Sequence, residues 1–148
     1  MQEASRAAQQ EIAREFTLSG DANSITRARE AVMGFVKPYL ASELEEIDVL
    51  IALQEALANA VLHGCQNDPS QTIHCSVLID RSAFTITIRD SGPGFDVEAA
   101  TQSTKAGTNV TEHGRGICLI LSVMDEVTYR SGGSEVHLRK LRTASGER

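Results

Sequence analysis

The pattern of apolar and polar residues begins with a short predicted strand, residues 15–19, and a helix from residue 23 or 24 to about residue 40. A helix of this length lays one apolar face on a core and ends where a proline removes a backbone donor. Pro38 marks that end. The predicted buried face consists of Ile25, Ala28, Val32, Phe35 and Val36.

A longer helical run, residues 43–64, follows Ser42 and Glu45, which have the spacing of a capping box. Glu55 and Asn59 are one turn apart and lie at the edge of its predicted core face. A carboxylate and an amide so placed can point into one cleft, although the same pair also occurs as solvated side chains on exposed helices. The predicted core face consists of Ile47, Leu50, Ile51, Leu57, Ala58 and Val61.

Alternating apolar residues predict a hairpin of two strands, residues 72–80 and 84–89. The second strand brings Asp90 to the end of the sheet. There the sequence Asp-Ser-Gly-Pro-Gly forms a tight turn, in which Gly92 and Gly94 allow the backbone to approach a ligand closely. The turn alone is equally typical of an ordinary hairpin end.

The next segment, residues 97–113, has no apolar period and predicts a mobile lid. It contains Lys105, either a phosphate contact or a solvated side chain. A Gly-Arg-Gly sequence at 114–116 then precedes an apolar helical run, residues 117–124. A helix start offers free N–H groups and a positive dipole end, so this position could bind an anion.

Two final strands, residues 126–131 and 135–141, form a second hairpin around Gly132 and Gly133. Two hairpins combined with three helices predict an α+β fold, a two-layer sandwich with a mostly antiparallel mixed sheet and helices on one face. We expect a short leader at 1–13, one domain at 14–142 and a disordered tail at 143–148.

Composition narrows the classes of protein. The 148 residues carry a net charge of −6 with scattered Lys and Arg, which argues against nucleic acid as a partner. Cys65, Cys75 and Cys118 have no CxxC spacing, which is typical of reduced thiols in the cytoplasm. The sequence has no apolar leader segment, and its longest apolar run, residues 117–121, is too short for a bilayer, so we expect no membrane association.

The nucleotide motifs of two common classes are absent from the sequence. There is no GxxxxGK[ST], and neither two-glycine turn continues to the third glycine of a dinucleotide fingerprint. In combination and order, however, the Glu55/Asn59 helix, the Asp90 turn and the 114–116 turn closely resemble the N, G1 and G2 boxes of the histidine-kinase-like ATPase superfamily. The resemblance covers about residues 12–141 and implies a Bergerat-type ATP-binding fold.

Within that superfamily, the segments EALANAVLHG, RDSGPGFD and HGRGICLILSVMDEVTY are most similar to the anti-sigma-factor serine/threonine protein kinases. The resemblance implies ATP and Mg²⁺ as cofactors. Asn59 would coordinate Mg²⁺, and Glu55 would be the general base that accepts the proton of a partner Ser or Thr hydroxyl.

The resemblance also implies that the two glycine turns contact different parts of the nucleotide. Asp90 would accept a hydrogen bond from the adenine amino group, while Gly92 and Gly94 admit the base. Ser134 matches a small hydroxyl residue near adenine. The phosphates would be held at the start of the third helix by Gly114, Arg115 and Gly116.

Three functions stay open at this level. The first is a kinase that binds a sigma factor or a comparable regulator and phosphorylates an anti-sigma-factor antagonist. The second is an ATP-binding partner-capture module without significant kinase activity, and the third is a detached catalytic domain that serves a separate phosphoacceptor protein. The 40 residues before the central helix are too short for the phosphotransfer domain of an intact two-component kinase. Family members commonly form homodimers, so we expect one here.

Overall fold

The computed structural model of the protein describes residues 11–106 and 112–142, and no side chain between residues 103 and 113. Within these residues, five strands form one sheet in the order β1-β2-β3-β5-β4, and each neighbouring pair is antiparallel. The strands are β1 Ile12–Ser19, β2 Thr72–Ile79, β3 Ala83–Arg89, β4 Glu126–Arg130 and β5 Glu135–Leu141.

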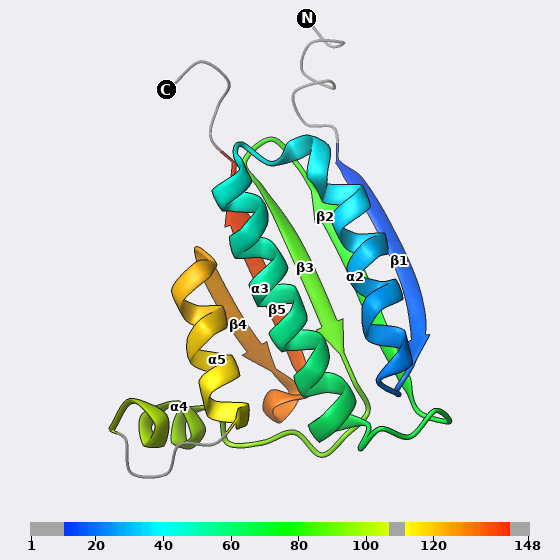
Figure 1. Ribbon diagram of the computed structural model, residues 1–148, viewed down its shortest axis with the longest axis vertical. Helices are drawn as coiled ribbons and strands as arrows, with labels where there is room; N and C mark the ends of the chain where they lie inside the picture. Colours follow the sequence, from blue (N-terminus) through cyan, green and yellow to red (C-terminus); the bar gives the residue numbers. More distant parts are fainter. Residues whose placement is uncertain (1–10, 107–111, 143–148) are drawn as a thin grey trace, which may run out of the picture.

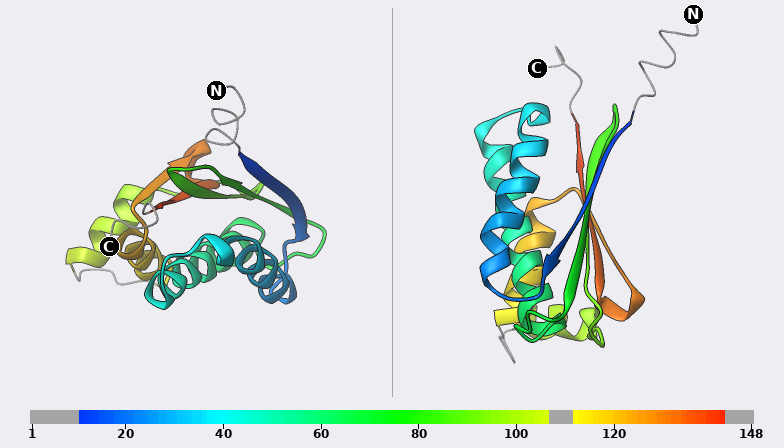
Figure 2. Two further views of the ribbon diagram at one scale, coloured as in Figure 1. Left: turned by 90° about the horizontal axis from the view of Figure 1, so that it is seen from above. Right: turned by 90° about the vertical axis from the view of Figure 1, so that its right-hand side faces the viewer.

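In the described part of the chain, helices cover one face of this sheet and leave the other face bare (Figures 1 and 2). The predicted α+β two-layer sandwich is therefore confirmed, with the refinement that every described strand pair is antiparallel. The helices are α2 Asn23–Val36, α3 Glu43–Asn59, α4 Val97–Ala106 and α5 Glu112–Val123, with short helical turns η1 Lys37–Tyr39, η2 Ala60–Gly64 and η3 Ser131–Gly133.

The core consists, as predicted, of the alternate apolar residues of the strands and of the apolar face of α2. Strand β2 alternates exposed and buried positions along its length, and Ala28, Val32 and Val36 of α2 are fully buried against the sheet. The first strand begins at Ile12, three residues before the predicted start. The charged residues Arg14 and Glu15 interrupt the apolar alternation there, so the pattern does not show where the strand begins.

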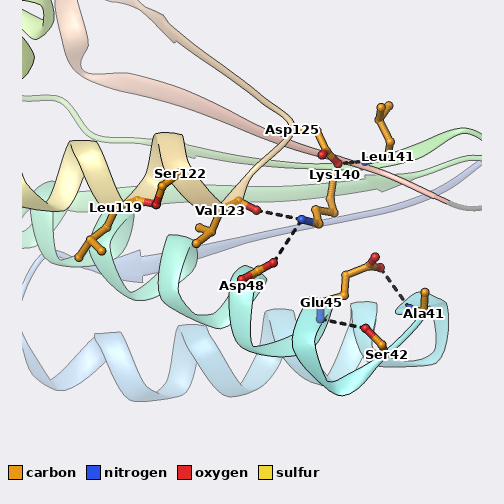
Figure 3. A network of polar contacts seen from close by, with 10 residues as sticks. All are labelled: Ala41, Ser42, Glu45, Asp48, Leu119, Ser122, Val123, Asp125, Lys140 and Leu141. Carbon is orange, nitrogen blue, oxygen red and sulfur yellow. Dashed lines mark hydrogen bonds and ion pairs between the residues drawn. The ribbon is translucent and has the colours of Figure 1, made fainter.

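The Ser42 half of the predicted capping box of α3 forms as expected, and the reciprocal bond of Glu45 goes to the residue before Ser42 (Figure 3). The Ser42 side chain accepts a hydrogen bond of 3.1 Å from the Glu45 backbone N–H, and Glu45 Oε1 accepts one of 3.1 Å from the Ala41 N–H. At its other end α3 continues into η2, a turn of π-helix that begins directly after Asn59. A π turn in a helix is often found at a functional site.

The predicted core face of the central helix is correct only in part: Leu57 and Val61 are buried as predicted, but the residues of its first half are not. Ile47 is 51% exposed and Leu50 is 37% exposed, because the helix is rotated so that smaller residues face the sheet. Apolar residues surround α3 on most sides, so their periodicity does not select one face. The buried residues are Val49, Ala52, Leu53, Ala56 and Leu57.

The same composition makes Glu43–Gly64 the one described segment long and apolar enough to cross a membrane. A core helix passes this test equally well, and this one packs against the sheet with neighbours on both sides (Figure 1).

Helix α4 occupies part of the segment predicted to be an irregular lid. Its first turn forms through local polar contacts, which a search for apolar periods does not detect. Asp96 Oδ1 accepts a hydrogen bond from the Ala99 N–H, at 2.9 Å, and the Thr101 hydroxyl donates to the Val97 carbonyl, at 2.8 Å. Residues 107–111 of the predicted lid lie outside the described residues.

Lys140 fixes the relative position of the two helices that carry the predicted site. Its side chain is only 12% exposed, and the ammonium lies 3.7 Å from Asp48 Oδ2 of α3 (Figure 3). It also donates to the Val123 carbonyl at the end of α5, at 2.8 Å. One cation of β5 therefore links the sheet to both helices.

Candidate functional site

Asp90 directly follows β3, at the end of the sheet where the chain turns. Its backbone N–H donates to the Ser134 carbonyl, at 2.9 Å, which places the predicted adenine contacts Asp90 and Ser134 side by side. The Gly92 N–H donates to Asp90 Oδ1, at 2.8 Å. Burial raises the pKa of the Asp90 carboxyl above its ordinary value, and the Gly92 hydrogen bond opposes this shift.

Glycines around this carboxylate allow three backbone segments to meet. A Cβ on Gly64, in η2, would collide with the Asp90 carboxylate, and one on Gly92 would collide with the Gly64 carbonyl. Gly94 has a φ of +76°, a conformation that favours glycine. A Cβ on Gly94 would also collide with the Gly132 carbonyl. The Asp90 turn therefore packs tightly on the C-terminal end of the central helix and on the β4–β5 turn.

Glu55 and Asn59 both face the start of α5. A Cβ on Gly116 would lie 2.7 Å from Glu55 Oε1 and 3.7 Å from Asn59 Oδ1. The structure thus brings together the predicted base, the predicted metal ligand and one of the predicted phosphate-binding glycines. All three lie at the end of the molecule where α3 ends, α5 begins and the β4–β5 turn lies (Figure 1).

Helix α5 begins at Glu112, five residues before the predicted run. Gly114, Arg115 and Gly116 therefore lie in its first two turns and not before it. Glycine usually disfavours a helix interior, but here it lets the Glu55 carboxylate approach closely, since a Cβ on Gly116 would lie 2.7 Å from Oε1 and displace it. Gly114 and Gly116 are buried and Arg115 is exposed.

Asn59 lies beside the second turn of α5, at Gly116, and an anion site at the start of this helix stays a prediction. Lys105 lies in α4, but its side chain is outside the described ones. Its predicted contact with phosphate also stays a prediction.

A cleft connects these elements and includes four of the predicted site residues, Asn59, Asp90, Gly94 and Ser134. The space in it that can hold water is only about 30 Å³, enough for very few water molecules. The other lining residues, which sequence reasoning missed, are Ala56, Ala60, His63, Gly64, Ile88, Phe95, Tyr129, Gly133 and Val136.

Two of the missed residues carried a sequence signal. Phe95 directly follows Gly94, so the turn that positions Asp90 also positions its ring. Tyr129 follows Val127 by two residues in β4, which places both on the face of the sheet toward the helices. A second hollow of about 440 Å³ lies on the bare face of the sheet, between Glu15 and Glu135, and none of the predicted site residues lines it.

The chemistry of the site fits a magnesium ion that takes most of its ligands from phosphate and water. Among the described residues, no group of three or more His, Cys, Asp or Glu side chains could hold a metal. The Asn59 amide oxygen lies near the first turns of α5, beside the Glu55 carboxylate. Mg²⁺ commonly uses one or two protein oxygens together with the phosphates of a nucleotide.

Comparison with known proteins identifies the family. The model of the histidine kinase-like ATPase domain matches residues 18–140. The anti-sigma F factor of Geobacillus stearothermophilus is 33% identical over 120 residues, which is 76% of this chain and 81% of that protein. Those of Anoxybacillus flavithermus and Halalkalibacterium halodurans are 38% identical over 128 residues and 34% over 136, covering 84% and 92% of their lengths.

A solved structure supports the same fold. The RsbU and RsbW domains of a Mycobacterium tuberculosis protein match with a TM-score of 0.55 at 14% identity, over 88% of this chain and 32% of that one. An identity this low supports the fold alone. The family match and the curated relatives together show that the chain belongs to the histidine kinase-like ATPase family and is a homologue of the anti-sigma F factors.

Proposed function

We propose that the protein is a Mg-ATP-dependent serine/threonine protein kinase that acts as an anti-sigma factor in a partner-switching pathway. The observation that carries this proposal is the position of Glu55. Its carboxylate lies beside Asn59 and the start of α5, next to the cleft that contains Asp90. The names of the relatives, anti-sigma F factors, support the regulatory part.

In this proposal one end of the site binds adenine and the other binds the phosphates and Mg²⁺. Asp90, with Gly92, Gly94 and Ser134 around it, accepts a hydrogen bond from the adenine amino group. Gly114, Arg115 and Gly116 hold the phosphates at the positive end of α5. Asn59 holds Mg²⁺, which neutralises charge on the phosphates when bound.

Glu55 is an acidic group beside the proposed phosphate end. It accepts the proton of a partner's Ser or Thr hydroxyl as that hydroxyl attacks the terminal phosphorus of ATP, the bond from this phosphorus to the bridging oxygen breaks, and ADP leaves. The proposed partners are a sigma factor or comparable regulator, an antagonist protein that carries the phosphoacceptor Ser or Thr, and a second copy of the chain in a homodimer. The proposed location is the cytoplasm, in keeping with three free cysteines.

A second candidate function is capture of a partner by an ATP-binding module without significant kinase activity. Its support is the apolar surface of α3, where Leu44 is 75% exposed and Ile47 is 51% exposed. Surface of this kind serves protein binding under either proposal. Glu55 distinguishes the two, because a pure binder needs no base.

The deciding experiment incubates the protein with ATP labelled in the terminal phosphate and with candidate antagonist proteins from the native cell. Transfer of label to a Ser or Thr of one antagonist supports the kinase. Binding of a partner without any transfer supports the capture module instead.

Adenine nucleotides are expected to stabilise the protein against heat. A ligand that binds only the folded state adds about 2.7 kcal/mol to the unfolding free energy at a hundredfold excess over its dissociation constant. For a domain of this size the melting temperature should rise by about 5 to 10 °C. Differential scanning fluorimetry with ADP, ATP and GTP tests this, and equal shifts with GTP would contradict recognition of adenine.

The variant Asn59→Ala is expected to weaken ATP binding about tenfold in Mg²⁺ and much less in EDTA, because only the metal-dependent part of the site is lost. Calorimetric titration in both buffers measures the difference. Gln54→Ala is the matched control, since Gln54 lies on the same helix and accepts a hydrogen bond from Arg29 of α2, at 2.6 Å. Equal losses in both buffers would remove Asn59 as the metal ligand.

A further inference from the structure

One buried polar atom in the cleft lacks a partner. Among the described residues, the Tyr129 hydroxyl is the buried side-chain oxygen or nitrogen without a hydrogen bond. A buried hydroxyl that loses its bonds to water costs folding free energy unless something replaces them. An unsatisfied group in a ligand cleft is therefore a candidate for a contact that the ligand completes.

The surroundings of Tyr129 hold its ring in place. In β4 it pairs with Val136 of β5, and both residues line the cleft. Its ring meets the Phe95 ring edge to face, with the centroids 5.9 Å apart and the planes at 78°. The Phe95 N–H donates to the Gly132 carbonyl, at 2.7 Å, so the strand and the Asp90 turn fix the ring from two sides.

We propose that Tyr129 is a further nucleotide-binding residue, whose hydroxyl donates a hydrogen bond to a ring nitrogen of the bound adenine. This inference rests on the proposed function, since it requires an adenine nucleotide in the cleft. The residues that line the cleft around Tyr129 suit the adenine base better than the ribose or the phosphates. Apolar walls suit a flat heterocycle, and they are formed here by Ala56, Ala60, Ile88 and Val136.

Asp90 and Tyr129 then recognise complementary groups of adenine. The Asp90 carboxylate can only accept, and it suits the exocyclic amino group. The phenol donates, and it suits an unprotonated ring nitrogen. Burial raises the pKa of Tyr129 to about 12, so the donor keeps its proton throughout the physiological range.

The variant Tyr129→Phe removes one oxygen and keeps the ring that packs on Phe95. The nucleotide-free protein is expected to melt at the same temperature as wild type or slightly higher, because the lost hydroxyl had no partner. The affinity for ADP is expected to fall about three- to tenfold, the usual effect of one hydrogen bond. Titration calorimetry measures the affinity and scanning fluorimetry measures the melting temperature.

The chain offers a matched control in its other tyrosine, Tyr39. It lies in η1, at the opposite end of the molecule from the site (Figure 1), where its ring is 5.2 Å from the Arg142 guanidinium. Tyr39→Phe makes the same chemical change and should leave ADP affinity unchanged. Unchanged ADP affinity in Tyr129→Phe would overturn the inference and indicate a hydroxyl that only a trapped water satisfies.

Analogues of ADP that each lack one ring nitrogen identify which nitrogen accepts the hydrogen bond from Tyr129. Wild type is expected to bind one of 1-deaza-ADP, 3-deaza-ADP and 7-deaza-ADP more weakly than ADP by about the factor lost in Tyr129→Phe. The variant should not distinguish that analogue from ADP. If the variant distinguishes all three as wild type does, the hydroxyl does not contact the base. If wild type binds no adenine nucleotide at all, the proposed function fails first.

Discussion

Replacing Glu55 by Gln is expected to slow phosphoryl transfer to the antagonist by about 10² to 10⁴, the usual effect of removing a positioned general base. Binding of nucleotide and of the partner should be retained. Glutamine keeps the shape and polarity of the side chain but cannot accept the hydroxyl proton. The measurement is a single-turnover rate at saturating ATP, with the ATP affinity of the variant determined separately.

The geometry explains why binding and catalysis should separate at this residue. Glu55 does not line the cleft that contains Asp90, so its replacement leaves the adenine end unchanged. Its Oε1 atom faces Gly116 of α5, where the phosphates are proposed to lie. The carboxylate can therefore meet an incoming hydroxyl without contacting the base.

Glu46→Gln is the matched control for this experiment. Glu46 lies on the same helix, where it forms a long ion pair of 3.6 Å with Lys37, whose side chain is 68% exposed while that of Glu46 is 34% exposed. An exposed pair of this kind contributes little to stability, so the control should transfer phosphate at the wild-type rate. A wild-type rate in Glu55→Gln as well would remove Glu55 as the base and favour the capture module.

The parts of the fold that the sequence predicted correctly are those in which local chemistry specifies a local structure. Period-two alternation defined β2 and β3, and Ser42 with Glu45 defined the start of α3. The turns at Gly94 and at Gly132 required a positive φ, which glycine adopts readily. These signals depend on neighbouring residues, so one sequence is enough to detect them.

The parts that were missed depend on packing between distant segments. The rotation of α3 could not be predicted because its apolar residues are spread around the helix, and the sheet selects the side with Ala52 and Ala56. The early start of α5, at Glu112, was missed because Gly114 and Gly116 are poor helix formers and nothing local in the sequence marks a helix there. The role of Tyr129 as a lining residue required knowledge that β5 pairs with β3, which brings the β4–β5 hairpin to the end of the sheet near Asp90.

Replacing Asp90 by Asn is expected to weaken ADP binding by about a hundredfold, because a hydrogen bond to a charged carboxylate is among the stronger ones. The amide keeps an oxygen that can accept from the Gly92 N–H, the bond of 2.8 Å that holds the turn. Its NH₂ group would then face the adenine amino group, donor against donor. Calorimetric titration measures the loss, and Asp68→Asn is a control because Asp68 lies in an exposed loop where it accepts from Ser70.

The same substitution should stabilise the protein without nucleotide at neutral pH. Burial raises the pKa of Asp90 in the folded state, so the folded protein binds this proton more tightly than the unfolded chain. Its contribution to stability is fully present below the ordinary aspartate pKa of about 3.9 and is lost as the pH rises through the folded-state pKa. Asparagine does not ionise, so Asp90→Asn should melt above wild type at pH 7, by a margin that narrows toward pH 4.

A variant that gains stability while it loses nucleotide affinity is difficult to attribute to misfolding. Melting curves from pH 4 to pH 7, with and without ADP, measure both effects on the same samples. A margin that does not change with pH would mean that the Asp90 carboxyl ionises in the fold as easily as in the unfolded chain. Undiminished stabilisation by ADP would place the base elsewhere in the cleft. The expected combination indicates a carboxylate held in a partly buried position for its ligand, at a cost in stability when the cleft is empty.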